Sequence, residues 1–197
     1  MTLKAENISG VILAGGENKR FDGINKSNLI IGGSSIISRI VNIISDIFPE
    51  IIIVTNTPEE FHAFNNYKIV RDLFLKVGPL GGIHSAIKAS SKESVFVFAG
   101  DMPFIDKEMI LNQIEYFSFC SADAVIPRVR DNDEPLHAIY RNSILCSLDK
   151  YLSQNNKYAT RDFLIKMNID YMTLPETEKT KRAFTNINTF DDVKKIQ

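Results

Sequence analysis

The sequence has little of what marks a secreted, membrane-spanning or metal-clustered protein. Its two cysteines, Cys120 and Cys146, show no CxxC spacing, and its three histidines lack the spacing of metal ligands. We therefore interpret the cysteines as core or incidental thiols in the reducing cytoplasm. The longest apolar runs, such as residues 51–54, are far too short to span a bilayer. The N-terminal stretch MTLKAENISG lacks the apolar segment of a signal peptide, so we expect a cytoplasmic location.

A strong net charge is also missing. The formal charge is −1, so there is no global basic field, and we expect neither a nucleic-acid partner nor a membrane partner. Any polyanionic ligand must be held by a few local groups. A chain of 197 residues that is 44% hydrophobic is long enough to bury a sizeable core, and it predicts a single domain over residues 1–197.

Predicted strands and helices alternate along the chain. Short apolar or β-branched runs predict strands at residues 8–14, 51–55, 68–70, 95–99, 124–127, 136–140 and 171–174. Helical spacing and capping residues predict helices at residues 34–48, 58–64, 83–89, 106–117, 142–152, 160–168 and 191–196. This alternation predicts an α/β fold of the Rossmann-like three-layer kind, in which helices cover both faces of a mostly parallel central sheet.

Polar residues follow the predicted strands at the points where they end. The first strand ends in the Gly-Gly pair of residues 15–16, and the next ends at Asn56. Asp72 and Asp101 follow two later strands. Because parallel α/β sheets bind ligands at the carboxyl ends of their strands, we expect these groups to share one edge of the sheet.

The turn after the first strand carries a cluster of cations. In LAGGENKRFDGINK, the two glycines allow backbone N–H groups to approach an anion, and Lys19, Arg20 and Lys26 suit phosphate. The spacing matches neither GxGxxG nor GxxxxGK[ST], so neither the dinucleotide fingerprint nor the P-loop applies. A glycine turn with a solvated basic loop is the alternative interpretation.

Asp101 ends the most apolar strand, VFVFAG. An uncompensated carboxylate there would be costly, and Mg²⁺ commonly takes one or two carboxylates together with substrate phosphates. The alternatives are structural: Asp101 as a turn residue, Asp72 in a salt bridge with the neighbours of Arg71, and Asn56 as a cap before Pro58.

Several segments in this order resemble the molybdenum cofactor guanylyltransferases. They are LAGGENKRFDGINK, RDLFLKVGPLGGIHSAI, GDMPFI, EPLHAIYRNSI and FTNINTFDDV, and the resemblance runs from Gly10 to Val193. It implies a nucleotidyltransferase fold that joins GMP from GTP to the terminal phosphate of molybdenum-molybdopterin, with Mg²⁺, and releases pyrophosphate. It further implies that residues 1–120 bind the nucleotide, that residues 121–197 form the second-substrate side, and that the protein makes transient contacts with other molybdenum cofactor proteins.

The resemblance also implies a role for individual positions. The nucleotide would be bound by the backbone of Leu13, Ala14 and Gly15 at the guanosine, by Lys26 at the phosphates, by Asn56 and Asp72 at the nucleoside, and by Asp101, which would also bind Mg²⁺. Departures from the family pattern are Asn18, Phe21, Asp22 and Asn25 in the phosphate loop, and Gly100 where cysteine is common.

The absence of an obvious catalytic triad fits this activity. A phosphate monoester is already anionic near pH 7 and needs no base to activate it, so Lys26 and Asp101 are the expected catalytic residues. Two alternatives stay open: a cytidylyltransferase acting on molybdopterin or another phosphorylated small molecule, and a non-catalytic nucleotide-binding module. The opening LAGG favours guanine over cytosine, since cytidylyl-transferring relatives more often resemble LAAG.

The C-terminal third allows two interpretations. Arg128, Arg130 and the segment EPLHAIYR line the pocket of the second substrate in one, and form an exposed charged hairpin in the other. For the segment NINT, we predict that Thr189 caps the last helix with Asp192 as the acid of a capping box.

Overall fold

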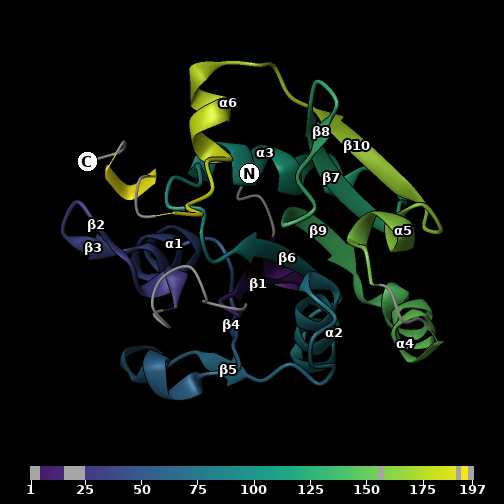
Figure 1. Cartoon of the computed structure of the whole chain (residues 1–197). Coiled ribbons are helices and arrows are strands. Elements are labelled where there is room, and N and C mark those ends of the chain that lie inside the picture. Colours follow the sequence, from purple (N-terminus) through teal and green to yellow (C-terminus); the bar gives the residue numbers. More distant parts are fainter. Residues whose placement is uncertain (1–4, 16–24, 155–157, 190–191, 195–197) are drawn as a thin grey trace.

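Helices flank both faces of a central sheet in the computed structural model, which describes residues 5–15, 25–154, 158–189 and 192–194 (Figure 1). The sheet strands are β1 (Ile8–Leu13), β4 (Ile51–Val54), β5 (Lys68–Val70), β6 (Ser94–Ala99), β7 (Ala124–Val129), β8 (Asn132–Asp133), β9 (His137–Arg141) and β10 (Ile169–Thr173). The α-helices are α1 (Ile36–Ile44), α2 (Pro79–Ala89), α3 (Lys107–Ser118), α4 (Leu145–Gln154), α5 (Thr160–Leu164) and α6 (Glu178–Ala183). The mostly parallel α/β fold expected from the sequence is confirmed.

The strand order is β10-β7-β9-β6-β1-β4-β5, with β8 paired to β7. Along this path β9 alone runs against the others, because a short connection from β7 allows only antiparallel pairing. Gly10 of β1 pairs with Ile51 of β4 on one side and with Phe96 of β6 on the other. The chain thus builds outward from β1 to β5 and then crosses back to β6. The carboxyl ends of β1 and β6 therefore form the switch point at which such sheets bind ligands.

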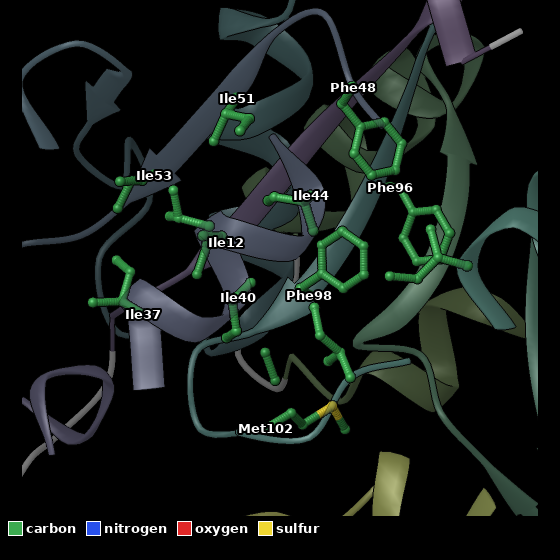
Figure 2. Close-up of a cluster of buried hydrophobic side chains, with 14 of the residues drawn as sticks. Ile12, Ile37, Ile40, Ile44, Phe48, Ile51, Ile53, Phe96, Phe98 and Met102 are labelled. Carbon is green, nitrogen blue, oxygen red and sulfur yellow. The ribbon is translucent and has the colours of Figure 1, made fainter. Parts of the chain in front are cut away.

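Alternating residues of the central strands supply two cores. Ile12, Phe96 and Phe98 point to the face that is covered by α1 and α3, and Figure 2 shows the two Phe rings beside residues of α1. These two rings stack with their centroids 4.4 Å apart. Val11 and Val97 point to the opposite face, which is covered by α2, α4 and α5. Because both faces are buried, the strands carry continuous apolar runs, and this is the pattern that made them recognisable in the sequence.

Several helix boundaries differ from those expected; α5, for example, ends at Leu164 and not at residue 168. The helix predicted for residues 34–48 spans Ile36–Ile44, because residues 34–35 pair with β2 (Ile30–Ile31) as strand β3 (Ser34–Ser35). The Ser35 hydroxyl then caps α1 by accepting from the Ser38 N–H. The helix predicted for residues 83–89 begins earlier, at Pro79, the first-turn position that proline favours.

Close packing explains the glycines at the start of α2. A Cβ at Gly81 would lie 2.7 Å from the backbone oxygen of Phe74, and a Cβ at Gly82 would lie 2.9 Å from the Leu13 side chain. Glycine is a poor helix former, so its cost here is offset by the approach of α2 to the end of β1. The helix would otherwise stand further from the edge of the sheet that holds the polar residues.

Further differences lie in the C-terminal third, where β8 and α6 were not expected. The helix predicted for residues 142–152 is divided into the 3₁₀ turn η4 (Asn142–Ile144) and α4. Of EPLHAIYR, His137 to Tyr140 form buried β9 in the middle of the sheet, so this part is not an exposed charged hairpin.

The capping box predicted at the C-terminal end is confirmed: Thr189 N–H donates to the Asp192 carboxylate at 2.8 Å, and Asp192 N–H donates to Thr189 Oγ1 at 3.2 Å. The helix predicted for residues 191–196 falls only partly within the described residues. In the described part of the chain, no helix combines the length and apolarity needed to cross a membrane.

Candidate active site

A cavity of about 560 Å³ opens at the carboxyl ends of β1, β4 and β6 and the first turn of α2. Six residues expected at the nucleotide lie in its wall: Leu13, Gly15, Lys26, Asn56, Asp72 and Asp101. Five of them lie at or just after strand ends that are far apart in sequence and that the parallel sheet brings together as expected, and Lys26 lies in the loop that follows β1.

Ala14 is the expected site residue that the structure does not place in the cavity wall. It is buried, and its N–H donates to the Val54 carbonyl at 2.9 Å. Its carbonyl accepts from Asn25 Nδ2 at 2.6 Å. Both backbone groups therefore already have partners within the protein, and Leu13 and Gly15 on either side are the residues that face the cavity.

Asn25 fastens the loop that carries Lys26. Besides its bond to Ala14, its Oδ1 accepts the Ser27 N–H at 3.0 Å, so that the side chain caps the 3₁₀ turn η2 (Lys26–Asn28). Asn25 is almost completely buried. An acid at this position could accept from Ser27 but could not donate to Ala14. The departure from the family pattern thus has a definite structural role, which no local sequence signal revealed.

Lys26 and Asp101 form the charged end of the cavity. Lys26 Nζ lies 3.5 Å from Asp101 Oδ2 and donates to Asn188 Oδ1 at 2.9 Å. The C-terminal segment is held there because Ile187 N–H donates to the Asp101 carbonyl at 2.9 Å. Burial raises the pKa of the Asp101 carboxyl, and the charge of Lys26 acts in the opposite direction. Lys26 from the first loop, Asp101 from the centre of the chain and the segment 187–188 from its end therefore contact one another at this end of the cavity.

Asn56 and Asp72 form a second pair. Asn56 Nδ2 donates to Asp72 Oδ2 at 3.1 Å, and Asp72 N–H donates to Asn56 Oδ1 at 3.3 Å. Asp72 Oδ1 is buried without a hydrogen-bond partner among the described residues. Burial raises the pKa of the Asp72 carboxyl, and the bond from Asn56 partly opposes this. The alternative of a salt bridge near Arg71 is not what forms, because Arg71 lies 3.8 Å from Glu59 instead.

Two glycines let the backbone come close around these side chains. A Cβ at Gly100 would lie 2.3 Å from Ser27 Oγ and 2.8 Å from the Leu13 carbonyl. Ser27 therefore fills the space that a cysteine at position 100 would need. A Cβ at Gly15 would meet Asp72 Oδ2 only at 3.8 Å, so Gly15 has room toward the cavity.

Other candidates lie elsewhere. Lys19 and Arg20, together with the departures Asn18, Phe21 and Asp22, are outside the described residues. Arg128 pairs with Asp133 at 2.5 Å, and Arg130 pairs with Glu176, so neither arginine lines the cavity. Lys76 and Asn188 were not singled out from the sequence. Lys76 lies six residues after the end of β5, within the quoted segment RDLFLKVGPLGGIHSAI, and Asn188 lies in the quoted segment NINT, but neither was given a role of its own.

A switch-point cavity lined by glycine backbone, two carboxylates and two lysines defines a nucleotide-binding α/β protein. Residues 10–168 match the family described as the MobA-like NTP transferase domain. The chain belongs to this family of nucleotidyltransferases and, within it, to the molybdenum cofactor guanylyltransferases.

The relatives match over nearly the whole chain. A probable molybdenum cofactor guanylyltransferase of Natranaerobius thermophilus is 36% identical, over 98% of this chain and 96% of its own length. The molybdenum cofactor guanylyltransferase of Desulfosudis oleivorans is 30% identical, over 96% and 94%. The crystal structure of molybdopterin-guanine dinucleotide biosynthesis protein A from Archaeoglobus fulgidus superposes with a TM-score of 0.80 at 27% identity, covering 95% of this chain and 96% of that one.

Proposed function

We propose that the protein transfers GMP from GTP to the terminal phosphate of molybdenum-molybdopterin and releases pyrophosphate. The observation that carries this proposal is the cavity at the switch point, which holds two pairs of residues. Lys26 of the loop after β1 pairs with Asp101 after β6, and Asn56 after β4 pairs with Asp72 after β5. The relatives named for this activity support it. A nucleotide has two chemically different ends, and the cavity has two chemically different pairs of residues to receive them.

The polar pair suits the nucleoside, and the charged pair suits the phosphates. Asn56 and Asp72 offer amide and carboxylate groups that can bond ribose hydroxyls or a base edge. Lys26 offers an ammonium group, and Gly15 leaves its backbone open to close approach. The triphosphate would then lie between the loop after β1 and the end of β6.

Nucleotidyltransferases of this kind typically need a divalent metal, and the residues present fit Mg²⁺. Asp101 supplies a hard oxygen donor at the mouth of a buried strand, and burial already disfavours its unneutralised charge. The described residues contain no cluster of three or more metal-ligating side chains. An ion at Asp101 would take its other ligands from phosphates and water. When bound, Mg²⁺ would neutralise charge on the phosphates that react.

The reaction needs positioning more than proton transfer. An oxygen of the molybdopterin phosphate forms a bond to the α-phosphorus of GTP while the bond to the β-phosphate oxygen breaks, and pyrophosphate leaves. The attacking oxygen is anionic at neutral pH, so no base is required. Lys26 would hold the phosphates, and Asn188 would hold Lys26 toward Asp101. Residues 121–197 would form the second-substrate side, since their NINT segment reaches the charged end.

The nucleotide specificity tests this proposal against the alternatives. Binding of GTP, CTP, ATP and UTP is measured with and without Mg²⁺, together with pyrophosphate release in the presence of molybdopterin. We expect GTP to bind most tightly and to be the nucleotide that supports release. Equal or tighter binding of CTP would favour a cytidylyltransferase, and GTP binding without release would favour a non-catalytic module.

Lys26→Ala tests the phosphate end of the cavity. Turnover at saturating GTP should fall by about 10²-fold, because a preorganised donor to the reacting phosphates is lost. The melting temperature should change little, since Lys26 lies in a polar loop. Lys107→Ala is the matched control, because it removes an exposed lysine whose partner is Asp46 on the protein surface. Full turnover by Lys26→Ala would transfer the role to Lys19 or Arg20.

A further inference from the structure

The loop between β5 and α2 places a second lysine at the cavity. Leu75 and Lys76 line it together with Gly78 and Pro79. Lys76 has a φ of 62°, which is uncommon for a residue other than glycine, and Gly78 has a φ of 68°. Unfavourable backbone conformations persist only where the surrounding structure enforces them, and they cluster at ligand sites.

Contacts on both sides hold this loop in place. Leu73 N–H donates to Ser85 Oγ at 2.9 Å, which ties the start of the loop to the middle of α2. Val77 is buried, and its Cγ2 lies 2.7 Å from where a Cβ at Gly81 would stand. Lys76 is thus positioned by its neighbours, and its own side chain contributes nothing to the anchoring.

The two lysines of the cavity wall differ in their surroundings. Lys26 already contacts Asp101 and Asn188, whereas Lys76 has no hydrogen-bond or ion-pair partner among the described residues. Lys76 also belongs to the wall that carries Asp72. Asp72 Oδ1 lies 3.6 Å from the Cβ position of Gly82, in the helix that the Lys76 loop enters. The cavity wall therefore holds a cationic donor and a carboxylate acceptor that both have no hydrogen-bond partner among the described residues.

We propose that Lys76 selects the base by donating a hydrogen bond to O6 of guanine, while Asp72 Oδ1 accepts from the N1–H or the 2-amino group. Guanine presents this acceptor beside these donors, and lysine is an established partner for O6. Adenine presents an amino donor at the same position, which faces the ammonium unfavourably. This inference rests on the proposed placement of GTP in the cavity and adds the residue that reads the base.

Lys76→Gly is the variant that tests it. Glycine accepts the positive φ, so the substitution removes the side chain while easing the backbone, and the melting temperature should hold or rise. Lys76→Arg keeps a cationic donor. Lys88→Ala is the control for charge, because Lys88 is exposed in the last turn of α2 and is not part of the cavity wall.

Calorimetric titration in Mg²⁺ uses GTP, ITP, ATP, guanosine and 2-aminopurine riboside triphosphate, which lacks O6. In Lys76→Gly, the three ligands that carry O6 should bind about tenfold more weakly, the size expected for one charged hydrogen bond. ATP and the 2-aminopurine nucleotide should change by less than about twofold on the same reasoning. Lys76→Arg should restore most of the loss, and Lys88→Ala should show none.

Two patterns would overturn the inference. An equal loss for GTP and the 2-aminopurine nucleotide, with guanosine unaffected, would mean that Lys76 contacts phosphate. No loss for any ligand would mean that Lys76 does not contact the nucleotide. A wild-type protein that fails to prefer GTP would instead defeat the proposed function and this inference together, and it is recognised before any variant is compared.

Discussion

Asp101 is the residue at which burial and charge conflict most directly. Its carboxylate follows a strand of buried residues, and the ammonium group of Lys26 stands 3.5 Å away. Burial raises the pKa of the carboxyl, so the apo protein holds this negative charge at a cost. A divalent cation bound beside this carboxylate would offset that cost, and it would also neutralise the charge of a bound polyanion.

Asp101→Asn separates a metal ligand from a turn residue. The amide keeps the shape and loses the charge, so metal-dependent pyrophosphate release should fall by about 10²-fold or more. The melting temperature should hold or rise, because the buried charge is gone. Asp46→Asn, on an exposed aspartate, is the control for a neutralised carboxylate. Near-normal release by a well-folded Asp101→Asn protein would end the metal assignment.

Asn25→Asp probes the fastening of the Lys26 loop. The change places a carboxylate oxygen where the amide now donates to the Ala14 carbonyl at 2.6 Å, in a buried setting. We expect a loss of about 2–3 kcal/mol in the free energy of unfolding, measured by denaturant titration, since a buried acceptor loses its donor. GTP binding should weaken as well, because Lys26 is the next residue. Unchanged stability would show that this bond does not hold the loop.

At the scale of elements, α3 and α6 depend on one aspartate. Asp106 was expected to cap α3, and the cap is confirmed: its Oδ1 accepts the Met109 N–H at 2.9 Å. The same oxygen lies 3.2 Å from Lys179 Nζ in α6, the helix that the sequence did not predict. A local capping signal was thus readable, whereas its second contact depends on how the C-terminal third folds back.

Asp106→Ala should lower the free energy of unfolding by about 1–2 kcal/mol, the usual cost of a lost N-cap. Asp106→Asn keeps a capping oxygen but loses the ion pair with Lys179, which is half exposed and worth at most about 1 kcal/mol. Denaturant unfolding of the two variants therefore separates the contribution of the N-cap to the free energy of unfolding from that of the ion pair. Equal losses in both would assign the whole effect to α6.

For the whole molecule, a buried histidine links stability to pH. His137 of β9 packs edge-on against Phe96, Phe98 and Phe184, and neither ring nitrogen has a partner among the described residues. Burial lowers the pKa of His137 to about 4, although the backbone of His137 itself and the charge of Asp106 act in the opposite direction. The folded protein therefore keeps this ring neutral at pH values where the unfolded chain binds a proton.

Comparison of the wild type with His137→Leu isolates this effect. As pH falls from about 6.5 to 4, the unfolded state gains a proton that the folded state refuses, so the wild type loses stability relative to the variant. The difference should reach about 3 kcal/mol, since one pKa unit corresponds to about 1.4 kcal/mol. Denaturant unfolding across this range measures it, and a His62→Gln control should follow the wild type because His62 is exposed. A constant difference between wild type and His137→Leu would refute the assignment.

The titration of Glu134 also changes the stability with pH, so the effect of His137 is visible only when the wild type is compared with the His137→Leu variant. Burial, with Asp133 nearby, raises the pKa of Glu134 to about 7. Its stabilising contribution is present below about pH 4.5 and is lost as pH rises through 7, which opposes the histidine. The pH profile of the wild type alone can therefore be nearly flat, while Glu134→Gln and His137→Leu should tilt it in opposite directions.

Much of the fold could be predicted because its strands are buried on both faces. Residues 51–54 and 94–99 carry apolar side chains at nearly every position, and residues 68–70 match their expected bounds. Strand ends in parallel sheets meet at one edge, so Gly15, Asn56, Asp72 and Asp101 could be placed together from the sequence, whereas Leu13 and Lys26 were added by the resemblance. The resemblance then assigned roles that residue types alone left open.

What escaped prediction has no periodic signal of its own. The β2–β3 hairpin uses two-residue strands, and α6 is a short polar helix whose contacts lie in distant segments. Helix α2 begins with residues that disfavour helices, and only its packing against Leu13 and Phe74 explains them. Short elements are stabilised by tertiary contacts, which local propensity does not encode.

The sequence by itself therefore determined the alternating fold, the sheet edge that holds the site, and the carboxylates and lysine found there. Tertiary structure alone decided that Asn25 bonds the end of β1, that Asn188 reaches Lys26 across 162 residues of chain, and that Lys76 and Asp72 line the same cavity. The physical reason lies in the range of the interactions. Hydrophobic alternation and strand-end chemistry are written in neighbouring residues, whereas these polar contacts exist only once the sheet has brought distant segments within hydrogen-bonding distance.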